Sequence, residues 1–369
     1  MSSSDQPNTT PERGEIFELT GLRGIAALMV ALLHLNFDIA GGFGDIYDDI
    51  TRTGFLGVDL FFILSGFVIA YRYNYVTRFQ SGAYLKFIWF RFWRIYPTHF
   101  FVTLFYVPVV AAAYLLGRHV DAMRFSVSSL VANLLLVQSW LGSDAMTWNS
   151  PAWTVSAEWL AYVVFPALMT LSSRVPRSLV LLNCAFLLLS VPALFFIFDI
   201  SGAGFTGLVR LFPEFLCGTL LWRLYEQNRT RTRTLDVGLG IVLVLMLTCG
   251  LYVPVDRPFL ALPLFAGAIY LSCRSAGFVS RCLSSRAMVF LGTISYSLYL
   301  VHWPIFSLLR GVLPAATPLS ARLVIGLSVA ILVAALAYRF IEAPCRQYGK
   351  RLWGSGACLA EFGLVRRRP

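Results

Sequence analysis

The sequence predicts an all-α integral membrane protein, a polytopic bundle of about ten transmembrane helices with both termini in the cytoplasm. Of its 369 residues, 57% are hydrophobic and only 13% are charged. The mean hydropathy of +0.70 lies above the range of soluble globular domains. Apolar stretches long enough to cross a bilayer recur from one end of the chain to the other. We therefore expect one membrane domain rather than a soluble domain with an anchor.

Apolar windows of about 17 to 25 residues define the expected spans in order along the chain. These windows are 19–37, 56–73, 96–117, 152–171, 178–198, 206–223, 236–253, 259–273, 287–310 and 320–341. Segment 126–141 is short for a span and carries Ser, Asn and Gln, which predicts a re-entrant or interfacial helix. We expect residues 1–15 to form a disordered cytoplasmic tail, 16–348 to form the membrane domain, and 349–369 to form a basic cytoplasmic tail.

Basic residues predict how this bundle is oriented in the cell inner membrane. With the N-terminus inside, the cytoplasmic connections carry 18 arginine and lysine residues, and the opposite connections carry seven. This bias matches the positive-inside rule. It also accounts for the net charge of +11 without a nucleic-acid partner, because no polar domain gathers the cations into one patch.

The seven cysteines are scattered, odd in number and without CxxC spacing. They predict neither a disulfide framework nor a metal site, and we expect no permanently bound cofactor. The polar N-terminus lacks the pattern of a cleavable signal, so the first helix is expected to be retained.

The first span carries an arginine and a histidine on one face. Arg23 and His34 are eleven residues apart in "LRGIAALMVALLH", which is about three helical turns or 16 Å along the axis. Ionisable groups at membrane depth usually face the interior of a bundle. Two other interpretations stay open: Arg23 as a snorkelling anchor, and His34 as a structural residue bonded to a neighbouring helix.

The second span, "GFLGVDLFFILSGFVIAY", contains an acid near its outer end. Asp59 needs a partner at that depth, and His34 is predicted at a similar level. A carboxylate that orients an imidazole fixes its tautomer and raises its basicity. For Ser65 and Gly66 in the same span we favour close helix packing over direct chemistry.

The segment "FIWFRFWRIYP" places Arg91 and Arg94 one helical turn apart among aromatic residues, at the predicted cytoplasmic start of the third span. Two guanidinium groups on one face can bind phosphate oxygens bidentately. An interfacial belt of aromatics and arginines fits the same spacing, so both interpretations stay open. Glu342 in "RFIEAPCR" is expected to pair with one of these arginines or with Arg339.

Two later segments add polar residues to the predicted outer half of the bundle. Glu158, in "NSPAWTVSAEWLAYVVFP", lies near the outer end of the fourth span and is either a structural ion-pair partner or a functional acid. Ser295, Tyr299 and His302 follow at i, i+4 and i+7 in "SYSLYLVH" and form one polar stripe. We expect the two histidines, Asp59 and Glu158 to converge on one wet pocket.

Six segments, in order, resemble the motifs of the acyltransferase-3 family of membrane O-acyltransferases. They are "LTGLRGIAALMVALLH", "GVDLFFILSGFVI", "FRFWRIYP", "WTVSAEWLAYVVFP", "LGTISYSLYLVHWPI" and "EAPCR". The resemblance implies a helical bundle that transfers an acyl group, commonly acetyl, from acyl-CoA to a hydroxyl group. The acceptors that it implies are sugars of exopolysaccharides, O-antigens, lipo-oligosaccharides and peptidoglycan, or macrolide antibiotics.

The resemblance also implies roles for residues in and near the first and third spans. Arg23 and His34 match the family's Arg-x10-His pair, which makes His34 the catalytic base or a transient acyl acceptor. Arg91 and Arg94 match its Arg-x-x-Arg motif and, with Arg23, would meet the phosphates of the donor. One departure lies nearby, because Thr20 stands where the family usually has an aspartate.

The family resemblance implies roles for residues of two further motifs. Glu158 matches the first acid of the family's Ser-Val-Glu-Glu motif, and we place it with Asp59 beside His34. Trp159 replaces the second acid of that motif. His302 matches a late histidine and, with the other residues of its polar stripe, is expected to bind or orient the acceptor.

These residues define a hypothesis in which acetyl-CoA, or a similar short acyl-CoA, enters from the cytoplasm and extends its pantetheine arm toward His34. Many relatives carry an extracytoplasmic SGNH hydrolase-like domain, so we expect either a separate periplasmic acyl-relay protein or direct access of the carbohydrate acceptor. The outer loops 38–55 and 118–150 are expected to set acceptor specificity. Two alternatives are a polysaccharide or lipid-linked sugar transporter, which the lack of an internal repeat disfavours, and an assembly partner of the polysaccharide synthesis machinery.

Overall fold

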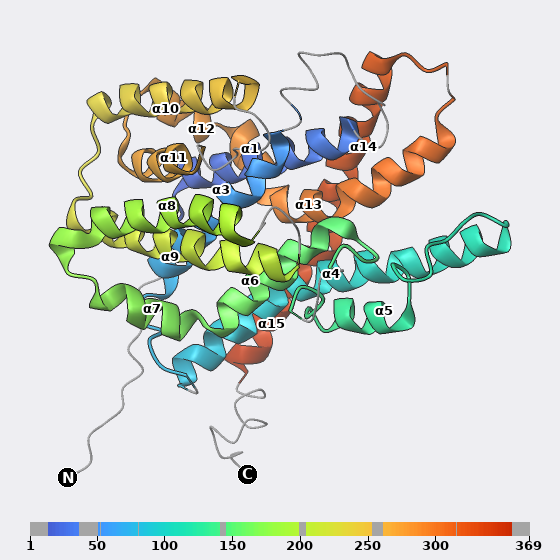
Figure 1. Ribbon diagram of the computed structural model, residues 1–369, viewed down its shortest axis with the longest axis horizontal. Coiled ribbons are helices and arrows are strands. Elements are labelled where there is room, and N and C mark those ends of the chain that lie inside the picture. The colour runs from blue at the N-terminus through green and yellow to red at the C-terminus, as the bar shows by residue number, and fades with distance from the viewer. Residues whose placement is uncertain are drawn as a thin grey trace, which may run out of the picture.

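The computed structural model of the protein describes residues 14–36, 51, 53–79, 81–140, 145–198, 204–252, 261–314 and 316–355. Within these ranges the chain forms helices and no strand, which confirms the all-α prediction (Figure 1). Most of the two predicted tails and most of loop 38–55 lie outside the described residues.

Three helices form the centre of the bundle: α1 (Phe17–Leu35), α3 (Leu56–Tyr73) and α13 (Arg286–Val312). α1 and α13 pack backbone against backbone. A Cβ added at Gly24 would lie only 2.8 Å from the backbone nitrogen of Gly292. Small residues permit this close approach, as is typical of helix pairs in membranes.

The contact between α3 and α9 (Phe205–Gln227) is equally close. A Cβ added at Gly66 would lie 2.0 Å from the carbonyl oxygen of Phe215, and one added at Gly218 would lie 2.0 Å from that of Ile63. The predicted packing role of Gly66 is therefore confirmed. Neither position accepts a side chain without separating the helices.

α4 (Gly82–Leu115) begins well before the predicted span, because the aromatic and basic residues at 82–95 form regular helix although they are not apolar enough for a span. The Ser81 hydroxyl caps its start by accepting a hydrogen bond from the backbone nitrogen of Tyr84 at 3.1 Å. α5 (Val127–Leu134) has only eight residues, about 12 Å. That length is too short to span, as expected for a re-entrant or interfacial helix.

The fourth predicted span consists of two helices. α6 (Trp153–Val163) and α7 (Phe165–Arg174) are bent by 63° about Val164. Pro166 in the first turn of α7 has no backbone N–H with which to continue the hydrogen-bond ladder of α6. The prediction of one continuous helix over 152–171 is therefore wrong.

A second group of helices lies beside the centre. Figure 1 shows α10, α11 and α12 together above α8 and α9. The bounds are Val180–Phe198 for α8, Arg233–Tyr252 for α10, Leu262–Arg274 for α11 and Phe278–Leu283 for α12. Short 3-10 turns precede α3, α6 and α8 at Thr53–Phe55, Ser150–Ala152 and Arg177–Leu179.

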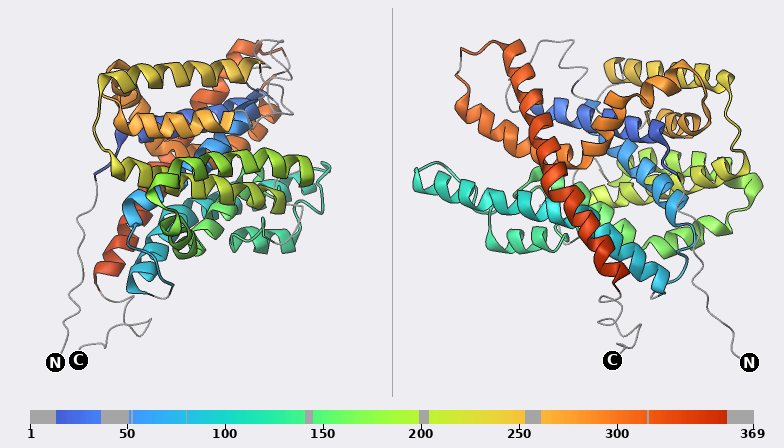
Figure 2. Two further views of the ribbon diagram at one scale, coloured as in Figure 1. Left: turned by 60° about the vertical axis from the view of Figure 1, so that its left-hand side comes forward. Right: turned by 180° about the vertical axis from the view of Figure 1, so that it is seen from behind.

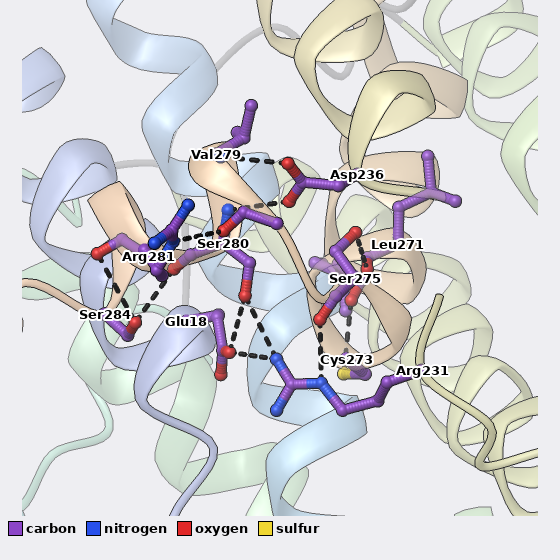
Figure 3. Close-up of polar contacts among 12 residues, drawn as sticks. Glu18, Arg231, Asp236, Leu271, Cys273, Ser275, Val279, Ser280, Arg281 and Ser284 are labelled. Carbon is purple, nitrogen blue, oxygen red and sulfur yellow. Dashed lines mark hydrogen bonds and ion pairs between the residues drawn. The ribbon is translucent and has the colours of Figure 1, made fainter. Parts of the chain in front are cut away.

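A polar network joins this second group to the start of α1 (Figure 3). The carboxylate of Glu18 forms an ion pair with Arg231 and accepts a hydrogen bond from the Ser280 hydroxyl at 2.8 Å. Asp236 accepts hydrogen bonds from the backbone nitrogens of Val279 and Ser280 at 3.0 and 2.8 Å, and so caps α12. The network fixes the position of α10 and α12 against the central helices.

The C-terminal helices form one long rod that crosses α4 (Figure 2). α14 (Leu319–Ala337) continues through a π-helical turn (Tyr338–Glu342) into α15 (Ala343–Gly354). The helix does not end near residue 341 as predicted; it continues through the π-helical turn, and Pro344 follows directly after that turn.

In the part of the chain that the structure describes, six helices are long and apolar enough to cross a membrane, or seven if α6 and α7 form one span. Each of the ten predicted windows contains helix. The chain is therefore a helical membrane protein with several candidate spans. The number ten and the cytoplasmic position of the termini remain predictions.

Candidate active site

A buried chamber lies between α1, α3, α4, α6 and α13. Its volume is about 800 Å³, part of it open to the surroundings. The predicted site residues that line it are Arg23, Arg91, Arg94, Glu158, Ser295 and Tyr299. They come from four helices that are far apart in the sequence, so most of the motifs meet at one place in the fold.

Two hydroxyl groups hold Glu158 in this chamber. Its Oε1 accepts hydrogen bonds from the Ser65 hydroxyl at 2.7 Å and from the Tyr162 hydroxyl at 2.5 Å. Hydrogen bonds to a carboxylate are among the stronger ones in proteins. Ser65 therefore contributes a polar contact to the site, in addition to the close packing that we predicted for it.

The depth that we predicted for Glu158 relative to Arg91 is corrected by the structure. The sequence placed Glu158 in the outer half and Arg91 at the cytoplasmic start of a helix, whereas both line the same chamber. α4 starts at Gly82, so Arg91 lies about 14 Å inside that helix. The early start of α4 brings its arginines to the level of Glu158.

Arg91 and Arg94 have different surroundings although they are one turn apart. Arg91 donates a hydrogen bond to the Tyr73 hydroxyl at 3.2 Å, and among the described residues it forms no ion pair. Its guanidinium carbon lies 5.2 Å from the centre of the Tyr73 ring and 5.9 Å from that of Tyr162. Arg94 forms an ion pair with Glu342, which confirms the predicted pairing of that acid. Of the two arginines, Arg91 is the one left to bind an anion.

His34 and His302 form a direct pair. The distance between His34 Nδ1 and His302 Nε2 is 2.9 Å, and the rings stack with centroids 5.0 Å apart. His302 is fully buried. The Trp303 ring lies perpendicular to that of His34, with centroids 4.9 Å apart. His34 is thus held by aromatic neighbours from α13, and the partner of its imidazole is a second imidazole rather than a carboxylate.

The hydrogen bonds of this pair assign the proton positions. His302 Nδ1 lies 3.1 Å from the carbonyl oxygen of Leu298, and a carbonyl only accepts, so Nδ1 carries the proton. The neutral His302 ring then offers a lone pair at Nε2, and His34 must donate to it from Nδ1. This leaves His34 Nε2 unprotonated, which is the form that a general base needs.

The histidine pair adjoins the chamber without lining it. Tyr299 forms the contact, since it lines the chamber and its ring centre lies 5.8 Å from that of His302. The expectation that both histidines, Asp59 and Glu158 share one pocket is therefore corrected. One turn of α13 separates the chamber from the histidines.

Asp59 belongs to a separate buried cluster. Its carboxylate lies 3.2 Å from the Arg210 guanidinium, and the side chain of Glu214, one turn along α9 from Arg210, lies next to it. Asp59 and Glu214 are both buried. The predicted pairing of Asp59 with His34 is replaced by this cluster, which the sequence analysis missed. The i, i+4 spacing of Arg210 and Glu214 within an apolar helix was the signal that could have indicated it.

A second cavity, which we call the vestibule, lies next to the chamber. Its volume is about 1310 Å³, part of it open to the surroundings. Arg23, Arg91 and Arg94 line both cavities, so the two are adjacent, and we call them together the passage. Three further cations line only the vestibule: Arg72, Arg346 and Lys350.

A carboxylate lies near Arg23 although Thr20 replaces the family's aspartate. The Thr20 hydroxyl donates a hydrogen bond to Glu15 at 2.6 Å, and Glu15 lines the vestibule together with Arg23. Glu15 therefore supplies an acid close to the position where the substitution removed one. Within the described ranges, no three His, Cys, Asp or Glu side chains are arranged to hold a metal ion.

The fold and these side chains define a class: a multi-pass helical membrane protein with a basic vestibule and a buried chamber that adjoins an imidazole pair. A sequence model described as an acyltransferase domain matches residues 16–339. The chain belongs to the acyltransferase-3 family, and the resemblance of its six motifs is confirmed.

The chain is also similar in sequence to named acyltransferases. The chain is 26% identical over 377 residues to peptidoglycan O-acetyltransferase OatA of Listeria monocytogenes, covering 92% of this chain and 57% of the relative. It is 35% identical over 170 residues to acyltransferase MdmB of Streptomyces mycarofaciens, covering 43% of this chain and 40% of the relative. The chain thus spans a little more than half the length of the Listeria protein. No solved structure matches.

Proposed function

We propose that the protein is a membrane O-acetyltransferase that moves an acetyl group from acetyl-CoA, or a similar short acyl-CoA, to a hydroxyl group of a carbohydrate. The observation that carries this proposal is the passage itself. It consists of a basic vestibule and the adjacent chamber, which share Arg91 in their lining, and Tyr299 in the chamber wall lies next to the histidine pair. A donor with a charged head and a thin arm would place its head in the vestibule and its arm in the chamber.

The cations of the passage suit the phosphates of coenzyme A. Arg91 is the best placed, because two tyrosines hold its guanidinium and no carboxylate among the described residues neutralises it. Arg23 donates to the carbonyl oxygen of Gly292 at 3.2 Å through Nε, which leaves its terminal nitrogens for an anion. Arg23 and His34 are about 16 Å apart along α1, a span that an extended pantetheine arm covers.

The transfer step follows from the tautomer of His34. We propose that Nε2 takes the proton of the acceptor hydroxyl as its oxygen forms a bond to the thioester carbonyl carbon. The carbon–sulfur bond then breaks, and the coenzyme A thiolate leaves with that proton. His302 acts as a positioning residue, since it fixes the proton on His34 Nδ1.

We further propose that the vestibule faces the cytoplasm and that the acceptor reaches His34 from the opposite face. The excess of basic residues in the connections on the vestibule side supports this orientation. The acceptor is either the carbohydrate itself or a separate acyl-relay protein. The name of the Listeria relative, a peptidoglycan O-acetyltransferase, makes peptidoglycan the first acceptor to test.

The test uses inside-out membrane vesicles with acetyl-CoA labelled in its acetyl group. We expect labelled glycan from the wild-type protein and none from His34→Ala at equal expression. His119→Ala is the matched control, because His119 is exposed and lines neither cavity. Undiminished labelling by His34→Ala would refute the role of His34. Movement of glycan across the membrane without labelling would instead identify a transporter.

A further inference from the structure

The cations of the vestibule fall into two sets. The inner set, Arg23, Arg91 and Arg94, lines both the chamber and the vestibule, whereas the outer set, Arg72, Arg346 and Lys350, lines the vestibule alone. The outer set therefore lies farther from the histidine pair. A ligand that fills the passage would meet the two sets with different parts of its charged head.

The fold positions the outer set. Arg72 stands in the last turn of α3, and Arg346 and Lys350 are one turn apart on α15, so they share a face. α15 is docked on α4 at Gly349, where an added Cβ would lie 2.3 Å from a ring carbon of Trp93. The Trp89 ring nitrogen donates to the Gly349 carbonyl at 2.8 Å. This contact fixes the register at which Arg346 and Lys350 face the vestibule.

The outer set is more exposed to water than the inner set. The Arg346 side chain is 39% exposed and that of Arg94 is 16% exposed. Arg94 has the buried Glu342 as its partner, and Arg346 lies 3.9 Å from the same carboxylate. A multiply charged anion suits the outer set, because it can bind there while it keeps part of its hydration shell and so avoids the full cost of desolvation.

We propose that Arg72, Arg346 and Lys350 form a subsite for the 3′-phosphate of coenzyme A, separate from an inner subsite for its diphosphate. This inference rests on the proposed function. A phosphomonoester carries about 1.5 to 2 negative charges at neutral pH, and three cations around one end of the passage match it. The subsite makes the protein select coenzyme A over its 3′-dephospho form.

The experiment compares two donors, acetyl-CoA and 3′-dephospho-acetyl-CoA, with the wild-type protein and with Arg346→Gln/Lys350→Gln. For the wild type we expect KM to be about 10- to 100-fold higher for the dephospho donor, as for a lost set of charge-assisted hydrogen bonds. The double variant should show that same increase with acetyl-CoA and no further increase with the dephospho donor. In every case kcat should stay within about twofold, because a contact to a remote phosphate stabilises the bound donor and the transition state equally.

The control is Arg351→Gln, which removes an exposed cation next to Lys350 that lines neither cavity. It should leave KM for both donors unchanged. An equal increase of KM for both donors in the double variant would overturn the subsite, as would a wild type that does not distinguish the donors.

Anionic lipid headgroups carry the same phosphate chemistry, so the measurements are made in nanodiscs of phosphatidylcholine with and without phosphatidylglycerol. The effect should persist in the neutral bilayer. A defect restricted to the anionic bilayer would assign the cations to lipid and overturn the proposal. Equilibrium binding of coenzyme A and dephospho-coenzyme A is measured in parallel. If the wild type transfers no acetyl group, the proposed function fails, and the binding ratio alone decides whether the subsite exists.

Discussion

Substitution of His302 by phenylalanine tests whether the histidine pair sets the protonation of the reacting nitrogen. Phenylalanine keeps a ring of similar size between His34, Tyr299 and Phe306, whose ring centres lie 5.0, 5.8 and 5.8 Å from that of His302. It removes the lone pair that accepts the hydrogen bond from His34 Nδ1 at 2.9 Å. The variant therefore changes the chemistry of the pair more than its packing.

The size of the effect follows from the buried hydrogen bond. A buried donor left without its acceptor costs about 1 to 3 kcal/mol, which corresponds to about a 5- to 150-fold change in an equilibrium. His34 avoids that cost by rotating its ring or by moving its proton to Nε2, and either change removes the base. We expect kcat of His302→Phe to fall by about this factor, while KM for the donor stays unchanged because neither histidine lines the chamber.

The assay is acetyl transfer by purified protein, measured over a range of donor concentrations, together with a thermal unfolding curve. His99→Phe is the matched control, since His99 is also a buried histidine and its Nε2 bonds the Asn133 carbonyl at 2.8 Å. His99→Phe should lose stability and keep kcat. Full kcat in His302→Phe, with the protein folded, would show that the tautomer of His34 does not depend on His302.

Two further predictions concern stability. Arg210→Met leaves Glu214 and its carboxylate neighbour buried without a cation, so the free energy of unfolding should fall by about 3 to 5 kcal/mol. The double variant Arg210→Met/Glu214→Gln should recover part of the lost free energy of unfolding in a thermal unfolding assay. No recovery would mean that the pairing of opposite charges does not stabilise the cluster. Gly292→Val should abolish the folded monomer, because its Cβ would lie 1.8 Å from the Thr20 carbonyl oxygen. A monodisperse, thermally stable Gly292→Val protein on size-exclusion chromatography would contradict this packing.

Much of the fold could be predicted from hydropathy, because apolar length is a local property. The span predicted at 56–73 matches α3 (Leu56–Tyr73), whose apolar run is followed directly by Asn74. The start of α4 could not be found in this way, since residues 82–95 are helical yet aromatic and basic. Nor did an apolar window show the break at Val164, which follows from one proline.

The candidate site was predictable residue by residue, but its pairings were not. Spacing on one helix indicated that Arg23 and Tyr299 face the interior, and the presence of an acid within an apolar span indicated the same for Glu158; all three line the chamber. The partner of His34 is a residue 268 positions away on α13. Such a contact depends on the close approach of two helices at their glycines, which the sequence does not show directly. The residue types alone favoured a carboxylate as the partner of the His34 imidazole.

The π-helical turn at Tyr338–Glu342 has a consequence for how sequences of this kind are compared. A π turn holds one residue more than an α turn, so losing one residue there would give an α turn and leave the side chains of α15 facing as before. Arg346 and Lys350 would still line the vestibule. In an alignment, a gap of one position within 338–342 is then compatible with unchanged donor recognition, whereas the loss of either cation is not.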